Sequence, residues 1–402
     1  MMHIFLNGMG ASAGGGLTYL RNVLPHLSRM QNVRTTALVS PEFKAGSECR
    51  ENVELLRLPF PGGSARRFWF EQTALPKVIR RCQADILISA GNFALRRSPV
   101  PQILLSRNSL YTSADFSRDI IRRGEYRMWL DTRLKGALAK KSIHWAGCTV
   151  APSEAFAGDL QRWSGKPVRA IHHGFDHELF FASRDPLPEE IRQKLECPTR
   201  TLRILLVSHY NYYRNIETVL RAIAVLAGEP GAPPVRLFLT CDLRKEKTPG
   251  AYDPQSAARL IDELGIREQV VELGSVPYEH LHHVYKFCDL FVTAAYTETF
   301  AHPVVEAMAS GLPVIASDLP VHREICGDAA AYFSRFSADE LVAQLSRLAA
   351  KPDERRLMAS SGLDRSHLYS WEIHVAQLLT LAQELLGEVS HRQPQSRAVS
   401  AA

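Results

Sequence analysis

Residues 296–317 read YTETFAHPVVEAMASGLPVIAS, and this stretch decides the fold. A short polar loop leads into a proline and a run of small apolar residues, followed by a glycine and a strand-like PVIAS. Pro303 suits the start of a helix, because its missing N–H would have no partner there. Gly311 suits the left-handed residue that follows the last helical turn. The stretch therefore predicts a loop, a helix over about residues 303–310 and a buried strand.

Two carboxylates bracket the start of this helix. Glu298 lies in the preceding loop, and we expect Glu306 in the first helical turn. The N–H groups at a helix start favour an anion, most commonly a phosphate. A nearby carboxylate can accept hydrogen bonds from sugar hydroxyls, as acidic residues do for ribose in other nucleotide folds. Glutamate is also common in a first turn because of the helix dipole, so the whole segment is more specific than either residue.

The alternation of strand and helix patterns extends over the whole chain and predicts an α/β fold. Such alternation implies parallel sheets that are covered by helices on both faces. The pattern runs twice, and the charged, proline-containing residues 181–200 separate the two runs. Two doubly wound domains joined in this way form a cleft, and ligands bind there at the carboxyl ends of the strands. The strand candidates are HIFLN, TTALVS, VELLRL, DILISA, QILLS, CTVAPS and VRAIHHG in the first run, and RILLVS, VRLFLT, QVVELG, LFVTAA, PVIAS and AAYF in the second.

These patterns predict four parts of the chain. We place an N-terminal Rossmann-like domain at residues 1–185 and a C-terminal one at residues 186–365. A closing amphipathic helix follows at residues 366–390, and residues 391–402 are polar and expected to be disordered.

Bulk composition is that of a globular protein of two domains. The 402 residues are 46% hydrophobic and 22% charged. No apolar run reaches the roughly 18 residues that cross a bilayer, and the N-terminus lacks the pattern of a signal peptide. We therefore expect a cytoplasmic location. The 7 cysteines are scattered and odd in number, which favours reduced, mostly buried thiols over disulfides or a zinc site.

Positive charge is concentrated in the first half of the chain. Residues 1–180 hold 25 Lys and Arg against 14 Asp and Glu, within a chain of net charge +6. This excess favours an anionic partner, namely a phospholipid surface, a polyphosphate or a nucleic acid, although a solvated basic face explains it equally well. Nucleic acid ranks last, because no nucleic-acid-binding motif accompanies the basic pairs.

The segment ETFAHPVVEAMASGLPVIAS resembles the E-x7-E segment of the family 4 retaining glycosyltransferases, which usually reads close to E-G-F-G-L-P-x-x-E-A-M-A-x-G-x-P-V. Glu298 matches the first glutamate, Phe300 the phenylalanine and Glu306 the second glutamate. Thr299 and Ala301 stand where the family usually has glycine. Both are small enough to let the backbone approach a diphosphate.

A second resemblance lies in VSHYNYYRNIETVL, where family members usually carry G-R-x-x-x-x-K. Arg214 matches the lysine and is suited to a bidentate grip on phosphate. His209 falls where the arginine should be, and a neutral imidazole would neutralise little phosphate charge. Without the resemblance, Arg214 reads as a surface residue at a helix start.

Other segments extend the resemblance over most of the chain. GASAGGGLTYLRNVL looks like the family's first glycine-rich loop, in which Gly15 and Gly16 would let the backbone come near a phosphate or sugar, although a glycine triplet also suits an ordinary strand-to-helix turn. The family would place the backbone around Ser275 and Val276 near the nucleobase. Arg107 and Asn108 are the candidates for the acceptor side, beside the transferred sugar. The donor-site residues that the resemblance implies are, by position, Gly15, Gly16, His209, Arg214, Ser275, Val276, Glu298, Thr299, Phe300, Ala301 and Glu306.

The resemblance implies the two-domain GT-B fold and a retaining transfer of a sugar from a nucleoside diphosphate to an acceptor hydroxyl. Glu298 would contact the transferred sugar and Glu306 the ribose. Arg214 and the N–H groups of Phe300 and Ala301 would stabilise the charge that grows on the diphosphate. No cofactor or metal is expected, and the sequence has no D-x-D pair, H-E-x-x-H, nucleophile elbow or Walker loop.

Partners and alternatives follow from the same resemblance. We expect a nucleotide-sugar donor, a carbohydrate or lipid-linked acceptor in cell-surface polysaccharide or glycolipid biosynthesis, and peripheral contact with an anionic membrane, but no nucleic acid. An epimerase or a phosphorylase of the same fold is disfavoured by the match at residues 298–317. A binding or scaffold protein that kept the fold and lost turnover remains an alternative, supported by His209 and the changed loop glycines.

Overall fold

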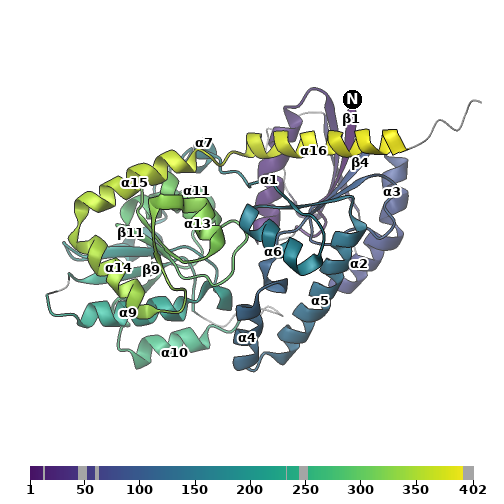
Figure 1. The fold of residues 1–402 in the computed structure, drawn as a ribbon. Helices are drawn as coiled ribbons and strands as arrows, with labels where there is room; N and C mark the ends of the chain where they lie inside the picture. Colours follow the sequence, from purple (N-terminus) through teal and green to yellow (C-terminus); the bar gives the residue numbers. More distant parts are fainter. Residues whose placement is uncertain (12–13, 44–51, 59–62, 232, 244–251, 393–402) are drawn as a thin grey trace, which may run out of the picture. The chain divides into compact units, whose positions relative to one another are not determined.

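The structure, a computed structural model, describes the 402-residue chain apart from residues 12–13, 44–51, 59–62, 232, 244–251 and 393–402. The described residues form two compact units. Unit 1 comprises Met1–Thr112, Thr132–Gly174 and the described residues from Trp371 onward, and unit 2 comprises Ser113–Asp131 and Phe175–Ser370. Each unit holds one sheet between helices (Figure 1). The predicted α/β fold with two Rossmann-like units is confirmed.

Unit 1 is built on a parallel sheet of seven strands in the order β3-β2-β1-β4-β5-β6-β7. The interior strand β1 pairs on both sides, so that Ile4 lies opposite Thr35 and Ile86. The strands of this sheet are apolar runs, because helices cover both faces of the sheet. The elements of unit 1 are β1 Met2–Asn7, α1 Gly14–Ser28, β2 Val33–Val39, β3 Val53–Arg57, α2 Ser64–Thr73, α3 Leu75–Arg81, β4 Ile86–Ser89, β5 Gln102–Leu105, η1 Ser109–Tyr111, most of α5 Tyr126–Trp145, β6 Cys148–Ala151, α6 Glu154–Ser164, β7 Arg169–Ala170 and α16 Trp371–Arg392.

Unit 2 is built on a parallel sheet of six strands in the order β10-β9-β8-β11-β12-β13. Strand β8 is the first along the chain and pairs with β9 on one side and β11 on the other. The elements of unit 2 are α4 Ala114–Arg122, α7 His177–Phe180, α8 Glu189–Lys194, β8 Leu202–Leu206, η2 Tyr212–Arg214, α9 Ile216–Gly228, β9 Val235–Leu239, α10 Gln255–Glu263, β10 Val270–Glu272, α11 Tyr278–Phe287, β11 Leu290–Thr293, α12 His302–Ala309, β12 Val314–Ser317, α13 Pro320–Cys326, η3 Gly327–Ala329, β13 Ala330–Phe333, α14 Ala338–Ala350 and α15 Pro352–Ser366.

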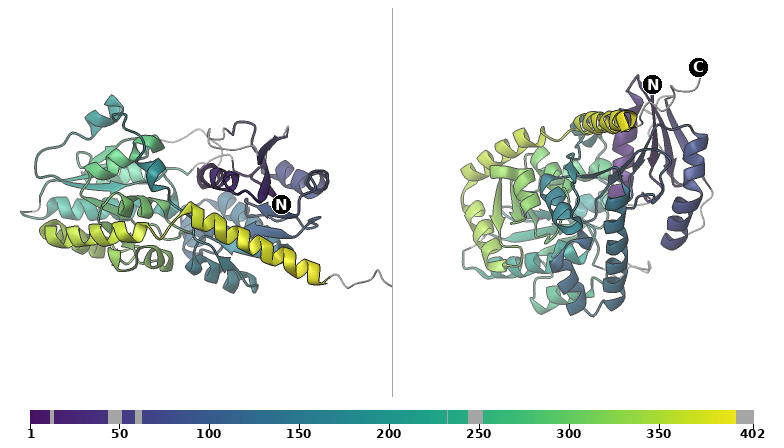
Figure 2. Two further views of the ribbon diagram at one scale, coloured as in Figure 1. Left: turned by 90° about the horizontal axis from the view of Figure 1, so that it is seen from above. Right: turned by 45° about the vertical axis from the view of Figure 1, so that its right-hand side comes forward.

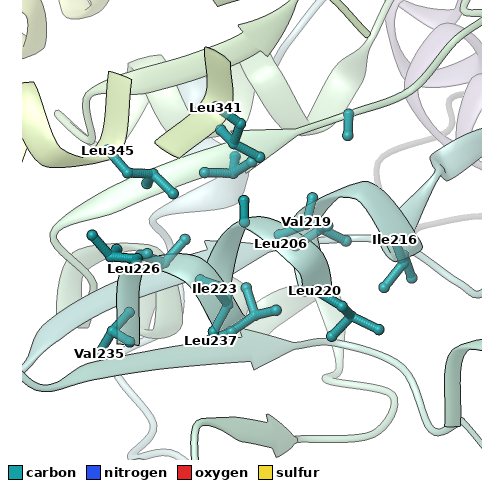
Figure 3. Packing of buried hydrophobic residues seen from close by; sticks show 14 of the residues in the cluster. Leu206, Ile216, Val219, Leu220, Ile223, Leu226, Val235, Leu237, Leu341 and Leu345 are labelled. Carbon is teal, nitrogen blue, oxygen red and sulfur yellow. The ribbon is translucent and has the colours of Figure 1, made fainter. Parts of the chain in front are cut away.

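One apolar cluster fills the space between the sheet of unit 2 and helices α9, α10 and α14. Helix α9 presents apolar side chains at a helical spacing, and nearly all of them are buried. In Figure 3 the leucine and isoleucine side chains of α9 lie between the strands β8 and β9 and the helix α14. The labelled members of this core are Leu206, Ile216, Val219, Leu220, Ile223, Leu226, Val235, Leu237, Leu341 and Leu345.

The sequence located the elements well. Every strand candidate overlaps a strand of the structure, although β7 is only Arg169–Ala170. The helix expected at 303–310 is α12, which begins one residue earlier. The closing helix begins at Trp371 rather than at residue 366, because α15 continues to Ser366 and a short break follows.

The two units divide the chain differently from the boundary that we drew at residue 185. Residues 175–185 pack with unit 2, and so do residues 113–131, which hold the whole of α4 and the start of α5. Nothing in the local pattern of α4 distinguishes it from a helix that covers the first sheet. The residues of α4 instead contact residues of unit 2 that lie far away in the sequence. These contacts are hydrogen bonds, ion pairs and ring contacts, which are described below.

The closing helix α16 belongs to unit 1. It packs against α1, and Figure 2 shows it as the long yellow helix beside the purple N-terminal elements. The Tyr19 hydroxyl lies 3.0 Å from Nε2 of His374, whose Nδ1 lies 2.8 Å from the carbonyl oxygen of His172. Since a carbonyl only accepts, Nδ1 carries the proton, and the hydroxyl donates to Nε2. The expected tail at 391–402 lies outside the described residues from 393 on.

The sequence also predicted reduced thiols and no membrane-spanning segment. Six cysteines are free thiols, of which Cys241, Cys288 and Cys326 are buried and the others half-buried, while Cys49 lies outside the described residues. Among the helices that the structure describes, none combines the length and the apolarity that crossing a membrane requires.

Candidate functional site

The predicted donor-site residues of unit 2 gather at the carboxyl ends of neighbouring parallel strands. The loop after β8 carries Arg214, and the loop after β11 carries Glu298. Strands β9 and β10 extend the sheet on one side of β8, and β11 begins the other side. Loops at such a reversal point diverge and leave a crevice, which is where ligands bind in doubly wound sheets.

An ion pair joins the two loops. Arg214 Nη1 donates to Glu298 Oε2 at 2.5 Å, and the exposed fractions of the two side chains are 19% and 12%. The other carboxylate oxygen accepts the Thr299 N–H at 3.0 Å. The two charged residues that the family resemblance selected separately are therefore in direct contact.

Burial by itself would raise the pKa of Glu298, but the charge of Arg214 and the hydrogen bond from Thr299 lower it below its usual value. Burial opposes the charge of Arg214 as well, and the attraction of Glu298 more than compensates, so the pKa of Arg214 is raised. Both groups are consequently ionised at neutral pH. The pair is neutral as a whole, and Glu298 is held in one orientation by two donors.

One hydrogen-bond donor of Arg214 is not used within the described residues. Its Nε is buried and has no hydrogen-bond partner among the described residues. The guanidinium lies over the ring of Tyr213, with its central carbon 5.2 Å from the ring centroid. A planar guanidinium offers five donors, so Arg214 can hold Glu298 and bind a second anion at the same time.

The helix α12 starts at an unusual backbone position. Ala301 is the residue before the helix and is left-handed, with φ 67° and ψ 57°. This conformation favours glycine, which explains physically why the family usually has glycine there. Because α12 begins at His302, Glu306 lies in its second turn. Our expectation of a first-turn position is wrong, since the helix starts one residue earlier than Pro303 indicated.

Glu306 is buried beside a tyrosine. The Tyr285 hydroxyl donates to Glu306 Oε2 at 2.9 Å, and it also lies 3.1 Å from the carbonyl oxygen of Pro303. Burial raises the pKa of Glu306 to about 7, and the Tyr285 hydrogen bond opposes that rise only in part. Unlike Glu298, this carboxyl forms no ion pair with an arginine among the described residues, and its pKa lies near neutrality.

Sequence reasoning missed His322, which lies close enough to this site to affect its charges. Its Nδ1 lies 2.8 Å from the carbonyl oxygen of Ser317, so Nδ1 carries the proton in the neutral ring. Its Nε2 is buried and has no hydrogen-bond partner among the described residues. Burial lowers the pKa of His322, whereas the charge of Glu298 raises it. Its sequence context, DLPVHREI, contains no signal that would have selected it.

The remaining predicted residues of unit 2 lie in loops near the same strand ends. His209 is exposed in the loop after β8, in contrast to Arg214 of that loop, which is half-buried. Ser275 is exposed and Val276 half-buried in the loop after β10. Phe300 is buried, with its ring 4.9 Å from His302 and 5.4 Å from Tyr369 between centroids.

The predicted residues of unit 1 form a second group. Gly16 lies in the first turn of α1, where an added Cβ would come within 3.0 Å of Ala11 and 4.0 Å of a guanidinium nitrogen of Arg107. Burial lowers the pKa of Arg107, whose side chain donates to the carbonyl of Ala90 and lies over the ring of Tyr19. Gly15 lies in the same helix turn.

Asn108 is occupied with a structural task. Its side-chain oxygen accepts the N–H of Leu110 at 3.0 Å and caps the short helix η1. Its neighbour Arg107 donates a backbone N–H to the Asn92 side chain at 2.6 Å. A role for Asn108 toward an acceptor stays a prediction.

Two family models match consecutive parts of the chain. "Glycosyltransferase Family 4" matches residues 13–179, and "Glycosyl transferases group 1" matches residues 188–364. The chain belongs to the family 4 glycosyltransferases. The two matched ranges correspond closely to the two sheets, and the second contains all of the predicted donor-site residues of unit 2.

Curated relatives of this family 4 chain are distant. It is 25% identical over 224 residues to a D-inositol 3-phosphate glycosyltransferase of Corynebacterium aurimucosum, a match of 54% of this chain and 52% of that protein. It is 27% identical over 226 residues to the enzyme of the same name from Mycobacterium bovis, covering 55% of this chain and 44% of that one. The matches therefore span about half the length of the relatives.

Solved structures share the fold over nearly the whole chain. Sucrose-phosphate synthase from Thermosynechococcus elongatus superposes with a TM-score of 0.75 at 20% identity, covering 96% of this chain and 100% of that one. Anabaena HepE in complex with UDP-glucose gives a TM-score of 0.69 at 16% identity, with coverage of 96% and 100%. WaaG, described as a glycosyltransferase involved in lipopolysaccharide biosynthesis, gives 0.64 at 16% identity, with coverage of 94% and 100%.

The left-handed Ala301 generates a stability prediction for this family 4 chain. Replacing Ala301 with glycine relieves roughly 1–2 kcal/mol of left-handed strain and adds about 0.5–1 kcal/mol of chain entropy in the unfolded state. We expect the free energy of unfolding to rise by up to about 1 kcal/mol, measured by urea denaturation. The matched control is Ala307→Gly in the right-handed interior of α12, which should lower it by about 1 kcal/mol or more. Equal losses in both variants would contradict the conformation of Ala301.

The raised pKa of Glu306 generates a pH prediction. Its pKa is about 7 in the fold, against 4.5 for an unperturbed glutamate, so the folded state binds the extra proton between these values. Stability should therefore fall as pH rises from about 4.5 to 7, by on the order of 3 kcal/mol. Thermal melts across this range should show the fall in the wild type and not in Glu306→Gln. A Gln variant with the same pH dependence as the wild type would contradict the assignment.

Proposed function

We propose that this chain is a retaining glycosyltransferase, which moves a sugar from a nucleoside diphosphate to an acceptor hydroxyl without a metal. The single observation that carries the proposal is the largely buried Arg214–Glu298 ion pair at the carboxyl ends of β8 and β11, whose side chains are 19% and 12% exposed. A reversal point in the strand order is where a nucleotide binds in doubly wound sheets, and α12 starts directly beside it. Family membership supports the same reading.

The residues of this pair suit the charges of such a transfer. The bond between the anomeric carbon and the diphosphate oxygen breaks, and its electron pair stays on the diphosphate. The acceptor oxygen bonds to the same carbon on the same face, and its proton passes to the departing phosphate oxygen. Arg214 would stabilise the diphosphate, and Glu298 would hold the sugar while positive charge builds on its ring.

The neutrality of the pair has a consequence for donor binding. If Arg214 had no counter-ion, its burial would be costly in the absence of a nucleotide. Glu298 supplies that counter-ion, and the unpartnered Nε of Arg214 remains for a phosphate oxygen. The site is thereby assembled before the donor arrives, which lowers the cost of ordering it on binding.

Glu306 completes the proposed donor site as the ribose ligand. Only the ionised carboxylate accepts hydrogen bonds from hydroxyls at both oxygens, because protonation turns one oxygen into a donor, and its pKa of about 7 leaves it half protonated at neutral pH. Nucleotide affinity should therefore be up to about tenfold weaker at pH 6 than at pH 8, because the competent fraction falls by that factor. Calorimetric titration with UDP tests this, and the Glu306→Gln variant corrects for the titration of the nucleotide phosphate. An unchanged affinity in the wild type would remove Glu306 from the ribose role.

The donor and acceptor classes are inferred from chemistry and from named relatives. HepE structures contain UDP and UDP-glucose, so UDP-glucose is the first donor to test. The acceptor is proposed to be a carbohydrate or lipid-linked hydroxyl in cell-surface polysaccharide or glycolipid biosynthesis. The name of WaaG, which refers to lipopolysaccharide biosynthesis, supports this class of acceptor. A donor screen read by mass spectrometry would identify the transferred sugar.

The second candidate function is a nucleotide-sugar-binding scaffold without turnover. The observation that favours it is the exposed His209, which stands where the family usually has a phosphate-binding arginine. Stabilisation by UDP, GDP, ADP or dTDP in thermal melts, without hydrolysis or transfer of any donor, would support the scaffold. Absence of stabilisation by all four would overturn both functions.

The two glutamates should differ in their effects on catalysis. Glu298→Gln should lower turnover by about 100-fold and leave nucleotide affinity within a few-fold, because Arg214 stays in place. Glu306→Ala should chiefly weaken nucleotide binding. The matched control is Glu268→Gln, an exposed glutamate of the same unit, which should behave as wild type. Wild-type kinetics in both site variants would refute the site.

Helix α5 is the surface that best fits the proposed membrane contact. Tyr126, Leu130 and Leu134 recur at intervals of four residues, and their exposed fractions are 66%, 53% and 63%. Exposed cations, including Arg127 and Lys141, lie on the same helix. Apolar and basic side chains on one exposed helix face are typical of binding to an anionic bilayer surface.

Vesicle sedimentation tests this contact. The protein should bind vesicles that contain phosphatidylglycerol, and binding should weaken with salt because part of it is electrostatic. Replacing Leu130 and Leu134 with serine should reduce binding severalfold, whereas Val225→Ser on α9, also an exposed apolar residue, should not. Equal binding to phosphatidylcholine vesicles, or none to either, would remove the membrane contact.

A further inference from the structure

Helix α4 contacts the candidate donor site although its sequence lies between β5 and α5. Asp119, near the middle of α4, is buried. It accepts a hydrogen bond at 2.9 Å from the hydroxyl of Tyr296, a residue 177 positions further along the chain. Tyr296 lies just after β11 and two residues before Glu298.

Tyr296 also connects the two loops of the site. Its backbone N–H donates to the carbonyl oxygen of Tyr213 at 3.0 Å. Tyr213 directly precedes Arg214, and Tyr296 lies in the loop that carries Glu298. This backbone hydrogen bond therefore fixes the separation of the loops whose side chains form the ion pair.

Helix α4 touches both ends of that connection. Asp119 holds the Tyr296 side chain, and the ring of Phe116, one turn earlier, packs edge-on against the ring of Tyr213 at 6.4 Å between centroids. On a helix, residues three apart lie on the same face, so both contacts come from one face of α4.

Asp119 is itself held firmly. One carboxylate oxygen accepts from Arg122 at 2.9 Å, and both accept from Nε of Arg123 at 3.1 Å. Arg123 also donates to the carboxylate of Glu217, at the start of α9, and to the Ser256 hydroxyl, both at 3.0 Å. A buried carboxylate with several donors has one orientation, so the Tyr296 hydroxyl meets a fixed acceptor.

We propose that α4 is a positioning element of the donor site, in which Asp119 acts through Tyr296 to hold Arg214 and Glu298 in register. The inference rests on the proposed function. Catalytic side chains tolerate displacements of only about 0.5 Å, so a support that fixes both loops affects turnover more than binding of the nucleoside. Asp119 and Tyr296 touch neither the proposed donor nor the reacting atoms and are positioning residues.

Tyr296→Phe is the most selective test, because it removes the hydroxyl and keeps the ring that packs against Phe336. Its partner variant is Asp119→Asn, and the double variant completes a thermodynamic cycle. The matched control is Arg118→Ala on the same helix, which removes an arginine whose side chain is 76% exposed and which pairs with Asp115 rather than with Asp119. Thermal melts of all variants correct each measurement for the folded fraction.

Two readouts separate positioning from a purely structural role. The first is turnover of UDP-glucose, by hydrolysis or transfer, resolved into kcat and KM. The second needs no turnover: the ratio of the Kd values of uridine and UDP by calorimetry, which reports how much the diphosphate adds to affinity. Arg214 serves the diphosphate, whereas the uridine affinity depends on the nucleoside contacts.

We expect Tyr296→Phe to lower kcat about tenfold. The ratio of the uridine Kd to the UDP Kd should fall about fivefold, with the uridine Kd itself within twofold of wild type. Asp119→Asn should have a similar effect, and the double variant should be no worse than the more impaired single variant. The control Arg118→Ala should match wild type. If Tyr296→Phe kept the wild-type kcat and the wild-type ratio of the uridine Kd to the UDP Kd, this inference would be overturned and the proposed function would stand. A wild-type protein that binds no UDP would overturn this UDP-donor site and the inference together.

Discussion

The largely buried ion pair between Arg214 and Glu298 is the interaction around which unit 2 is arranged. Each charge would be costly to bury alone, so the loops that carry them must meet and stay together. The order of the sheet makes this meeting possible, because β8 and β11 are adjacent strands although 84 residues separate the two charges. A strand order without that adjacency would leave two uncompensated charges.

A residue in the left-handed backbone conformation precedes each of the two helices that start at this site. Asn215 precedes α9 with φ 53°, and Ala301 precedes α12 with φ 67°. Asn215 is well suited to this conformation, and its side chain donates to the carbonyls of Ala294 and Arg335 at 3.2 and 2.6 Å. Ala301 has no such compensation. Strain at this position places the start of α12 next to Glu298, which fits the tendency of strain to be kept at functional sites.

Much of the fold follows from local patterns, while the contacts inside the site do not. Continuous apolar runs identified the strands, and Pro303 and Gly311 located α12 to within one residue of its bounds His302–Ala309. The family resemblance selected Arg214, Glu298 and Glu306 individually. It did not indicate that the first two pair, or that Tyr285 and burial bring the third to a pKa of about 7. Burial and long-range neighbours set those properties, and neither is written in local spacing.

The sequence by itself determined the two parallel sheets and the bounds of α12 to within one residue, because these depend on periodicity and on residue type within short segments. The family resemblance selected the two glutamates, and their role stays a prediction. Only the tertiary structure decided which residues share the site with them. Asp119 lies 177 positions before Tyr296, and His322 lies in a segment without a recognisable motif. Their places are fixed by strand adjacency and by the need of buried polar groups for partners, which act only once the chain is folded.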